Sequence, residues 1–121
     1  MLSQLGQIAI NVEDLERAVA FYRDALQVPF LFQFPGFAFF DCAGVRLMLS
    51  KPEGGEIHGR ASVLYFKVAD IDAEARNLAS RNVKFEQPPH LVARLPDHEL
   101  WMAFFRDPNG NLLALMSEVR S

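Results

Sequence analysis

The apolar and polar positions of this chain run through the same order twice. Residues 7–15 (QIAINVEDL) and 63–71 (VLYFKVADI) lie 56 positions apart, and each alternating run leads through a valine to an acidic residue and then to an amphipathic segment. Residues 41–44 (DCAG) before VRLML and 107–110 (DPNG) before NLLALM repeat at an interval of 66. Alternation with period two is typical of strands, and such self-similarity predicts two copies of one strand, helix and hairpin module.

In the first half, the opening strand turns its alternate apolar residues, from Ile8 to Val12, to one face. Asp14 is placed to cap a helix whose apolar face has helical spacing and which ends before Pro29, since proline cannot continue a helix. The elements predicted in this half are a strand at 5–12, the helix after Asp14, and strands at 29–34, 37–41 and 45–50.

The second half repeats this order. Asn82 is placed as a left-handed cap at the end of the second helix, and Pro88-Pro89 is expected to interrupt the strand that begins near Val83. The other elements predicted here are a strand at 61–68, a helix at 71–81, a loop at 95–98, and strands at 99–106 and 111–117.

Each half is therefore a β-α-β-β-β module, and neither can bury a sheet face alone. We expect one α+β domain over residues 5–119, in which two tandem modules form a strongly curved, eight-stranded mixed sheet with the helices outside. Module one covers 1–52, a Gly-rich and charged linker covers 51–60, and module two covers 61–119.

Composition excludes several classes of partner. The chain has 121 residues, half of them hydrophobic, a net charge of −3 and no run of Lys or Arg. Nucleic acid and anionic membranes are bound by a concentrated basic face, so neither is expected as a partner. The apolar stretches are far shorter than the ~20 residues of a membrane span, and no signal peptide is recognised. The lone Cys42 excludes an internal disulfide, which fits a cytoplasmic location.

Two motifs resemble a known family. The opening NVEDLERAVAFYRDALQV and the closing FFRDPNGNLLAL are similar to the vicinal oxygen chelate superfamily, which includes glyoxalase I, bleomycin-resistance proteins and extradiol dioxygenases. The resemblance covers about residues 5–119. It implies the paired-module fold and a homodimer, in some members with modules exchanged between chains, which the linker is long enough to permit. These motifs are mainly structural, so they indicate the fold far more than the reaction.

The resemblance also locates the positions that hold a metal ion in metal-dependent members. In this chain those positions are Gln7, Met48, Val63 and Ala114. Divalent cations need several carboxylate, imidazole or thiolate ligands. This set offers only one amide oxygen. We therefore predict that the family's metal site is absent and that no cofactor is bound.

Strand alternation predicts what lines the concave face of the sheet instead. If each four-residue turn pairs the residues that flank it, this face is mainly aromatic and Met-rich. Such a lining is typical of a pocket for an organic ligand, and Arg46 and Lys67 favour a carboxylate or phenolate. The alternative is that the same side chains fill the concavity as core. The predicted ligand-binding residues are Gln7, Asn11, Phe37, Phe39, Arg46, Met48, Val63, Tyr65, Lys67, Trp101, Phe105 and Ala114.

The three histidines offer a second chemistry. A relocated metal site could draw on His58, His90 and His98 with Glu56 or Glu118, although no pair has the spacing of metal ligands on one element. His98 and Glu99 are weak candidates for a catalytic acid–base pair, because adjacent residues of a strand point to opposite faces.

Three functional hypotheses follow. The first is a metal-free protein that binds a small aromatic or amphipathic, anionic molecule. The second is an enzyme, a glyoxalase-like lyase, an isomerase or a dioxygenase, with a relocated metal or a His-based mechanism. The third is a regulatory or structural dimer whose concavity is filled by its own side chains.

Overall fold

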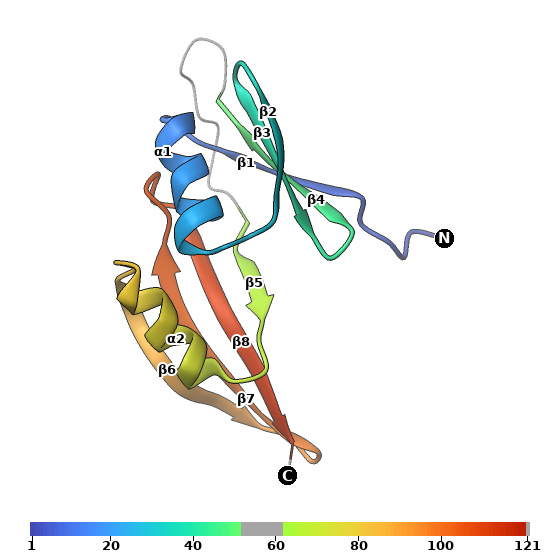
Figure 1. Cartoon of the computed structure of the whole chain (residues 1–121). Helices are drawn as coiled ribbons and strands as arrows, with labels where there is room; N and C mark the ends of the chain where they lie inside the picture. Colours follow the sequence, from blue (N-terminus) through green and yellow to red (C-terminus); the bar gives the residue numbers. More distant parts are fainter. Residues whose placement is uncertain (52–61, 121) are drawn as a thin grey trace. The chain divides into compact units, whose positions relative to one another are not determined.

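The computed structural model describes residues 1–51 and 62–120, and the chain divides into two compact units, residues 1–61 and 62–121. Each unit contains one four-stranded mixed sheet with helix packed against it, in the predicted β-α-β-β-β order (Figure 1). The predicted linker 51–60 lies outside the described residues except for Lys51. None of the described helices is long and apolar enough to cross a membrane.

The first unit contains a sheet with the strand order β1-β4-β3-β2. Its strands β1 and β4 are parallel, and the other neighbours are antiparallel. Buried apolar side chains from one face of this sheet, including Ile10, Phe40 and Leu49, form its core with Val19 and Tyr22 of the helical segment. The elements of this unit are β1 (Gln7–Asn11), α1 (Leu15–Ala20), η1 (Phe21–Ala25), β2 (Phe30–Phe34), β3 (Phe37–Cys42) and β4 (Val45–Ser50).

The first helix begins as predicted but changes form before it ends. The Asp14 side chain accepts a hydrogen bond from the Arg17 backbone N–H (3.1 Å), which satisfies one of the donors left free at a helix start. After Ala20 the helix widens into the π-helical turn η1, in which the Leu26 N–H donates to the Phe21 carbonyl. Tyr22 is fully buried on this turn.

The second unit repeats the arrangement in the strand order β5-β8-β7-β6. Asp70 caps α2 as Asp14 caps α1, and Asn82 takes the predicted left-handed conformation (φ 69°). The elements of this unit are β5 (Leu64–Lys67), α2 (Ile71–Ser80), β6 (Phe85–Arg94), β7 (His98–Arg106) and β8 (Leu112–Arg120).

The prediction that Pro88-Pro89 interrupts a strand is wrong. β6 runs through both prolines, because it is an edge strand and its pairing with β7 shifts between Gln87 and His90. An edge strand with a bulge does not need the backbone N–H that proline lacks.

The two sheets have equivalent registers. Ala9 pairs with Met48 in the first sheet and Tyr65 pairs with Ala114 in the second, which preserves the sequence intervals of 56 and 66. The internal repeat of the sequence is therefore a repeat of strand pairing.

Candidate functional site

The face of the first sheet opposite α1 consists of three cross-strand rows. The register places Gln7 beside Arg46, Ala9 beside Met48 and Asn11 beside Ser50. The Arg46 row continues to Asp41 of β3, whereas the other two rows continue across β3 and β2 to aromatic side chains. We call the group Phe32, Phe34, Phe37, Phe39 and Met48 the aromatic face.

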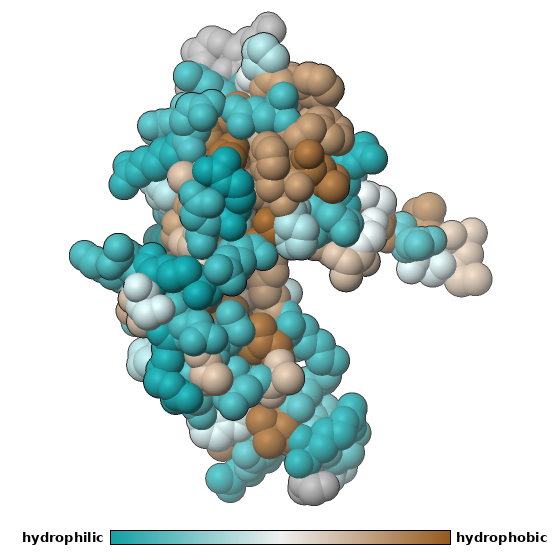
Figure 2. Space-filling model, in the orientation of Figure 1, coloured by the Kyte–Doolittle hydropathy of each residue, from teal (hydrophilic) through white to brown (hydrophobic). Residues whose placement is uncertain are grey.

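The rings of Phe32, Phe34 and Phe39 contact one another, and the aromatic face remains partly accessible to solvent. The ring centroid of Phe32 lies 4.9 Å from that of Phe39 and 5.3 Å from that of Phe34. Phe34 is 56% exposed, and Phe32 and Phe37 are 41% exposed. Figure 2 shows hydrophobic side chains gathered over the region of β2 and β3. A cluster of exposed large apolar side chains on a small domain is typical of binding surfaces.

A cation and an amide lie at one end of this face. The guanidinium carbon of Arg46 is 5.8 Å from the centroid of the Phe39 ring, a cation–π arrangement. Gln7 Nε2 is 4.0 Å from the sulfur of Met48, which is a weak contact. All six residues predicted from the first module thus share one face: Gln7, Asn11, Phe37, Phe39, Arg46 and Met48. Whether they bind a ligand stays a prediction.

Sequence reasoning missed Phe32 and Phe34. A bulge at Leu31 shifts the pairing, so Phe30 pairs with Phe40 and Phe32 pairs with Phe39. Phe30 therefore lies on the helix side of the sheet and Phe32 on the aromatic face, although plain alternation would put both on one side. Phe32 and Phe34 are two positions apart in the sequence, which could have predicted that they share a face of the strand.

In the second sheet the face opposite α2 differs from the prediction. Tyr65 and Lys67 lie on it with Ala114, as expected, and alternation places Val63 on the same side. The placement of Trp101 and Phe105 there is wrong. Phe105 pairs with Leu113 and is fully buried on the α2 side, and Trp101 lies on that side as well, where its indole N–H donates to Glu99 Oε1 (3.2 Å).

The turn between β7 and β8 explains this error. Arg106 pairs with Leu112, so the turn contains five residues rather than four. The buried carboxylate of Asp107 accepts hydrogen bonds from the backbone N–H groups of Asn109 and Asn111 and from the Asn111 side chain, which holds the fifth residue in the turn. A register shift of one residue turns every side chain of a strand to the other face.

Met102 and Phe104 occupy the face that Trp101 and Phe105 were expected to line. Phe104 pairs with Ala114, and its ring centroid is 6.3 Å from that of Tyr65 and 6.2 Å from that of His90. The sequence signal for the longer turn was Asn111, a polar residue that follows Asp-Pro-Asn-Gly where the first module has the apolar Val45.

The four positions that the resemblance assigns to a metal ion offer few donor atoms. Gln7 and Met48 contribute one amide and one thioether, while Val63 and Ala114 contribute no donor, and Ala114 is fully buried beside Tyr65. No group of three His, Cys, Asp or Glu side chains that could hold a metal occurs within residues 1–51 and 62–120. His58 and Glu56 lie outside that range. His90 Nδ1 lies 2.8 Å from the Pro88 carbonyl oxygen.

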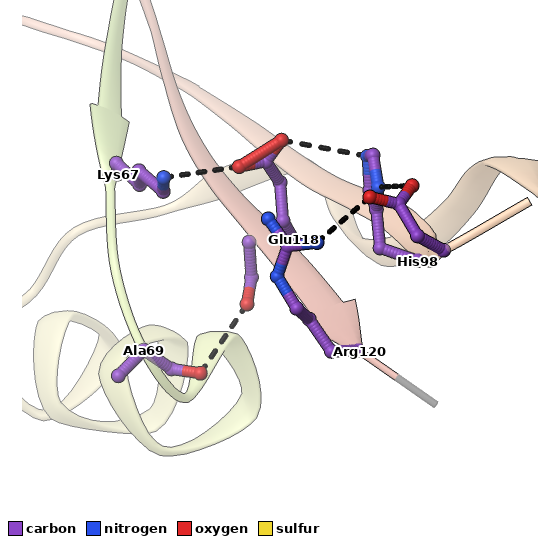
Figure 3. Close-up of polar contacts among 7 residues, drawn as sticks. Lys67, Ala69, His98, Glu118 and Arg120 are labelled. Carbon is purple, nitrogen blue, oxygen red and sulfur yellow. Dashed lines mark hydrogen bonds and ion pairs between the residues drawn. The ribbon is translucent and has the colours of Figure 1, made fainter. Parts of the chain in front are cut away.

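A polar network lies at the far end of β7 and β8 (Figure 3). His98 Nδ1 is 2.8 Å from Asp97 Oδ1, and His98 Nε2 is 3.4 Å from Glu118 Oε2. Lys67 Nζ is 3.0 Å from the other Glu118 oxygen, and Arg120 is 2.8 Å from Asp97. The His98 side chain is 13% exposed.

These contacts correct the expected pairing of His98 with Glu99. The carboxylate partners of His98 are Asp97 and Glu118, while Glu99 pairs with Arg94 on the opposite face. The hydrogen bond from His98 lowers the pKa of Asp97, with a further contribution from Arg120. The hydrogen bond from Lys67 lowers the pKa of Glu118. Both carboxylates are therefore ionised near neutral pH.

Comparison with known proteins identifies the family. Residues 4–115 match the model of the Glyoxalase/Bleomycin resistance protein/Dioxygenase superfamily, and the chain belongs to that superfamily. It is 32% identical, over an alignment of 129 residues, to the uncharacterized protein YraH of Bacillus subtilis (strain 168), covering 93% of this chain and 96% of YraH.

Solved structures share the fold. A lactoylglutathione lyase from Agrobacterium tumefaciens has a TM-score of 0.78 at 24% identity, over 95% of this chain and 93% of that one. A superfamily member from Nocardioides has a TM-score of 0.76 at 24% identity, over 98% of this chain and 85% of that one. Identity this low supports the fold and says nothing about the reaction.

Proposed function

We propose that this protein binds a small aromatic or amphipathic organic molecule without a metal ion. The observation that carries the proposal is the aromatic face, in which Phe32, Phe34 and Phe37 remain 41–56% exposed beside Met48. Covering about 100 Å² of apolar surface contributes roughly 2.5 kcal/mol, so a flat ring of ordinary size gains binding energy from this face alone. Rigid aromatic side chains lose little conformational entropy when a ligand settles on them.

The chemistry of the family metal positions supports the metal-free part of the proposal. Gln7, Met48, Val63 and Ala114 provide no carboxylate, imidazole or thiolate, which are the usual ligands of zinc, nickel and iron sites. A ligand held by this protein therefore needs contacts with the sheet itself.

The test is binding of a panel of aromatic acids and their neutral carboxamides, measured by calorimetry and thermal shift in the presence of EDTA. We expect at least one compound to raise the melting temperature, because a ligand that binds only the folded state stabilises it. Phe32→Ala should weaken binding about fivefold or more, since a stacked ring is worth roughly 1 kcal/mol or more. If no compound binds with or without added zinc, nickel or iron, the protein is better described as a structural or regulatory dimer.

Phe30 provides a matched control in the same strand. Its ring is 37% exposed, close to the 41% of Phe32, but it lies on the helix side of the sheet against Phe40. Phe30→Ala should leave ligand affinity within about twofold. Equal losses for the two variants would contradict binding at the aromatic face.

A metal-free lyase or isomerase is a second candidate function, favoured by the His98 network. An imidazole held between Asp97 and Glu118 can exchange a proton with a substrate. Lactoylglutathione lyase activity that persists in EDTA and is abolished by His98→Gln would support this candidate over simple binding.

A further inference from the structure

We infer that the aromatic face selects an aromatic carboxylate, with the Arg46 guanidinium holding the carboxylate and the Gln7 amide as a second donor. This inference rests on the proposed function and specifies its ligand class. It follows from the placement of Arg46, which has no ion-pair partner within residues 1–51 and 62–120, beside an exposed aromatic cluster.

Arg46 lies in the row that joins β1, β4 and β3. Its cross-strand neighbours are Gln7 on one side and Asp41 on the other. Its guanidinium carbon is 5.8 Å from the Phe39 ring centroid, so the charged group is held next to the aromatic face. A guanidinium presents its N–H groups in one plane, a geometry that matches the two oxygens of a carboxylate.

No carboxylate of the described residues forms an ion pair with Arg46. Among residues 1–51 and 62–120, Arg46 has no ion-pair partner, and the neighbouring Asp41 carboxylate accepts a hydrogen bond from the Gly44 backbone N–H at 3.0 Å. The Gln7 amide makes only the weak 4.0 Å contact with the Met48 sulfur, so its N–H groups are available for a ligand oxygen.

Lys67, the other cation expected to favour an anion, is already neutralised. Its ammonium nitrogen is 3.0 Å from Glu118 Oε1, on the same face of the second sheet. The sequence predicted that both Arg46 and Lys67 attract an anionic ligand. In the structure only Arg46 is left to do so, because Lys67 is paired with Glu118. We therefore expect the anionic group of the ligand to bind at the first sheet.

The test compares 2-naphthoate with its neutral carboxamide, 2-naphthamide, by calorimetry in EDTA. Wild-type protein should bind the acid about tenfold more tightly than the amide, because a charge-assisted bidentate contact is worth roughly 1.4 kcal/mol or more here. Arg46→Gln should weaken the acid about tenfold and leave the amide within about twofold. Arg46→Lys should recover only part of the affinity, since an ammonium is not bidentate.

Arg17→Gln is the charge-matched control. Arg17 is exposed on α1, which covers the other face of the same sheet, so its loss should leave both affinities within about twofold. Thermal unfolding of each variant checks that the fold is retained, as expected for changes at exposed positions.

The outcomes separate this inference from the proposed function. Equal binding of acid and amide, unaffected by Arg46→Gln, would overturn the carboxylate assignment and leave aromatic binding standing. An equal loss of acid affinity in Lys67→Gln and Arg46→Gln would also overturn it, because the anion would then depend on the second sheet as well. Binding of neither compound, nor of any other aromatic acid or amide, would overturn both.

Discussion

Phe39 and Phe40 are neighbours in β3 whose side chains lie on opposite faces of the first sheet. Phe40 is fully buried against Tyr22 and Phe30, whereas Phe39 belongs to the partly exposed aromatic face. The two residues therefore have different roles: one supports the core, and the other is available for contact with a ligand.

Alanine substitutions should separate these roles. Phe40→Ala should lower the free energy of unfolding by about 3–5 kcal/mol, because it leaves a cavity in the core. Phe39→Ala should cost only about 1–2 kcal/mol, since less apolar surface is removed from water at this position. Urea unfolding curves give both values. Comparable losses would mean that the aromatic face is buried in the folded protein.

At the scale of elements, the two closing hairpins differ in how strongly their turns are held. The buried Asp107 carboxylate accepts hydrogen bonds from the Asn109 backbone and from the Asn111 backbone and side chain, while Asp41 in the equivalent turn accepts one from Gly44. The longer turn is what sets the register of β7 against β8, and so decides which side chains of β7 lie on the sheet face opposite α2.

Asp107→Ala should therefore destabilise the protein by about 2–4 kcal/mol, because several part-buried N–H groups lose their shared acceptor at once. Asp41→Ala, the matched change in the other hairpin, should cost about 0.5–1.5 kcal/mol, the usual value of one hydrogen bond. Chemical denaturation measures the difference. An equal loss of unfolding free energy in Asp41→Ala and Asp107→Ala would contradict a larger contribution from the Asp107 turn.

At the scale of the whole molecule, the absence of a bound metal stays a prediction, which rests on the residue types at Gln7, Met48, Val63 and Ala114. We expect purified protein to contain well below one equivalent of zinc, nickel or iron by elemental analysis. EDTA should leave the melting temperature unchanged, because no bound ion contributes to stability. One tightly held equivalent of a transition metal would refute the metal-free proposal.

The homodimer and the cytoplasmic location that the sequence led us to expect also stay predictions.

Much of the architecture was predictable because its signals are local. Strand alternation, the aspartate caps Asp14 and Asp70 and the left-handed Asn82 each depend on a few neighbouring residues, and all appear in the structure. The eight strands form two four-stranded sheets, one in each module. The face of the first sheet followed from alternation within β1, β3 and β4.

The chain by itself determined the order of elements, the internal repeat and the residue types at the family metal positions, since these depend on composition and short-range spacing. Only the tertiary structure decided which β7 residues lie opposite α2, on which side of the first sheet Phe32 lies, and that Glu118 neutralises Lys67 while Arg46 has no described carboxylate partner. The physical reason is that one residue more or less in a turn or bulge changes the face of every side chain beyond it, and pairing across strands then determines which charges meet.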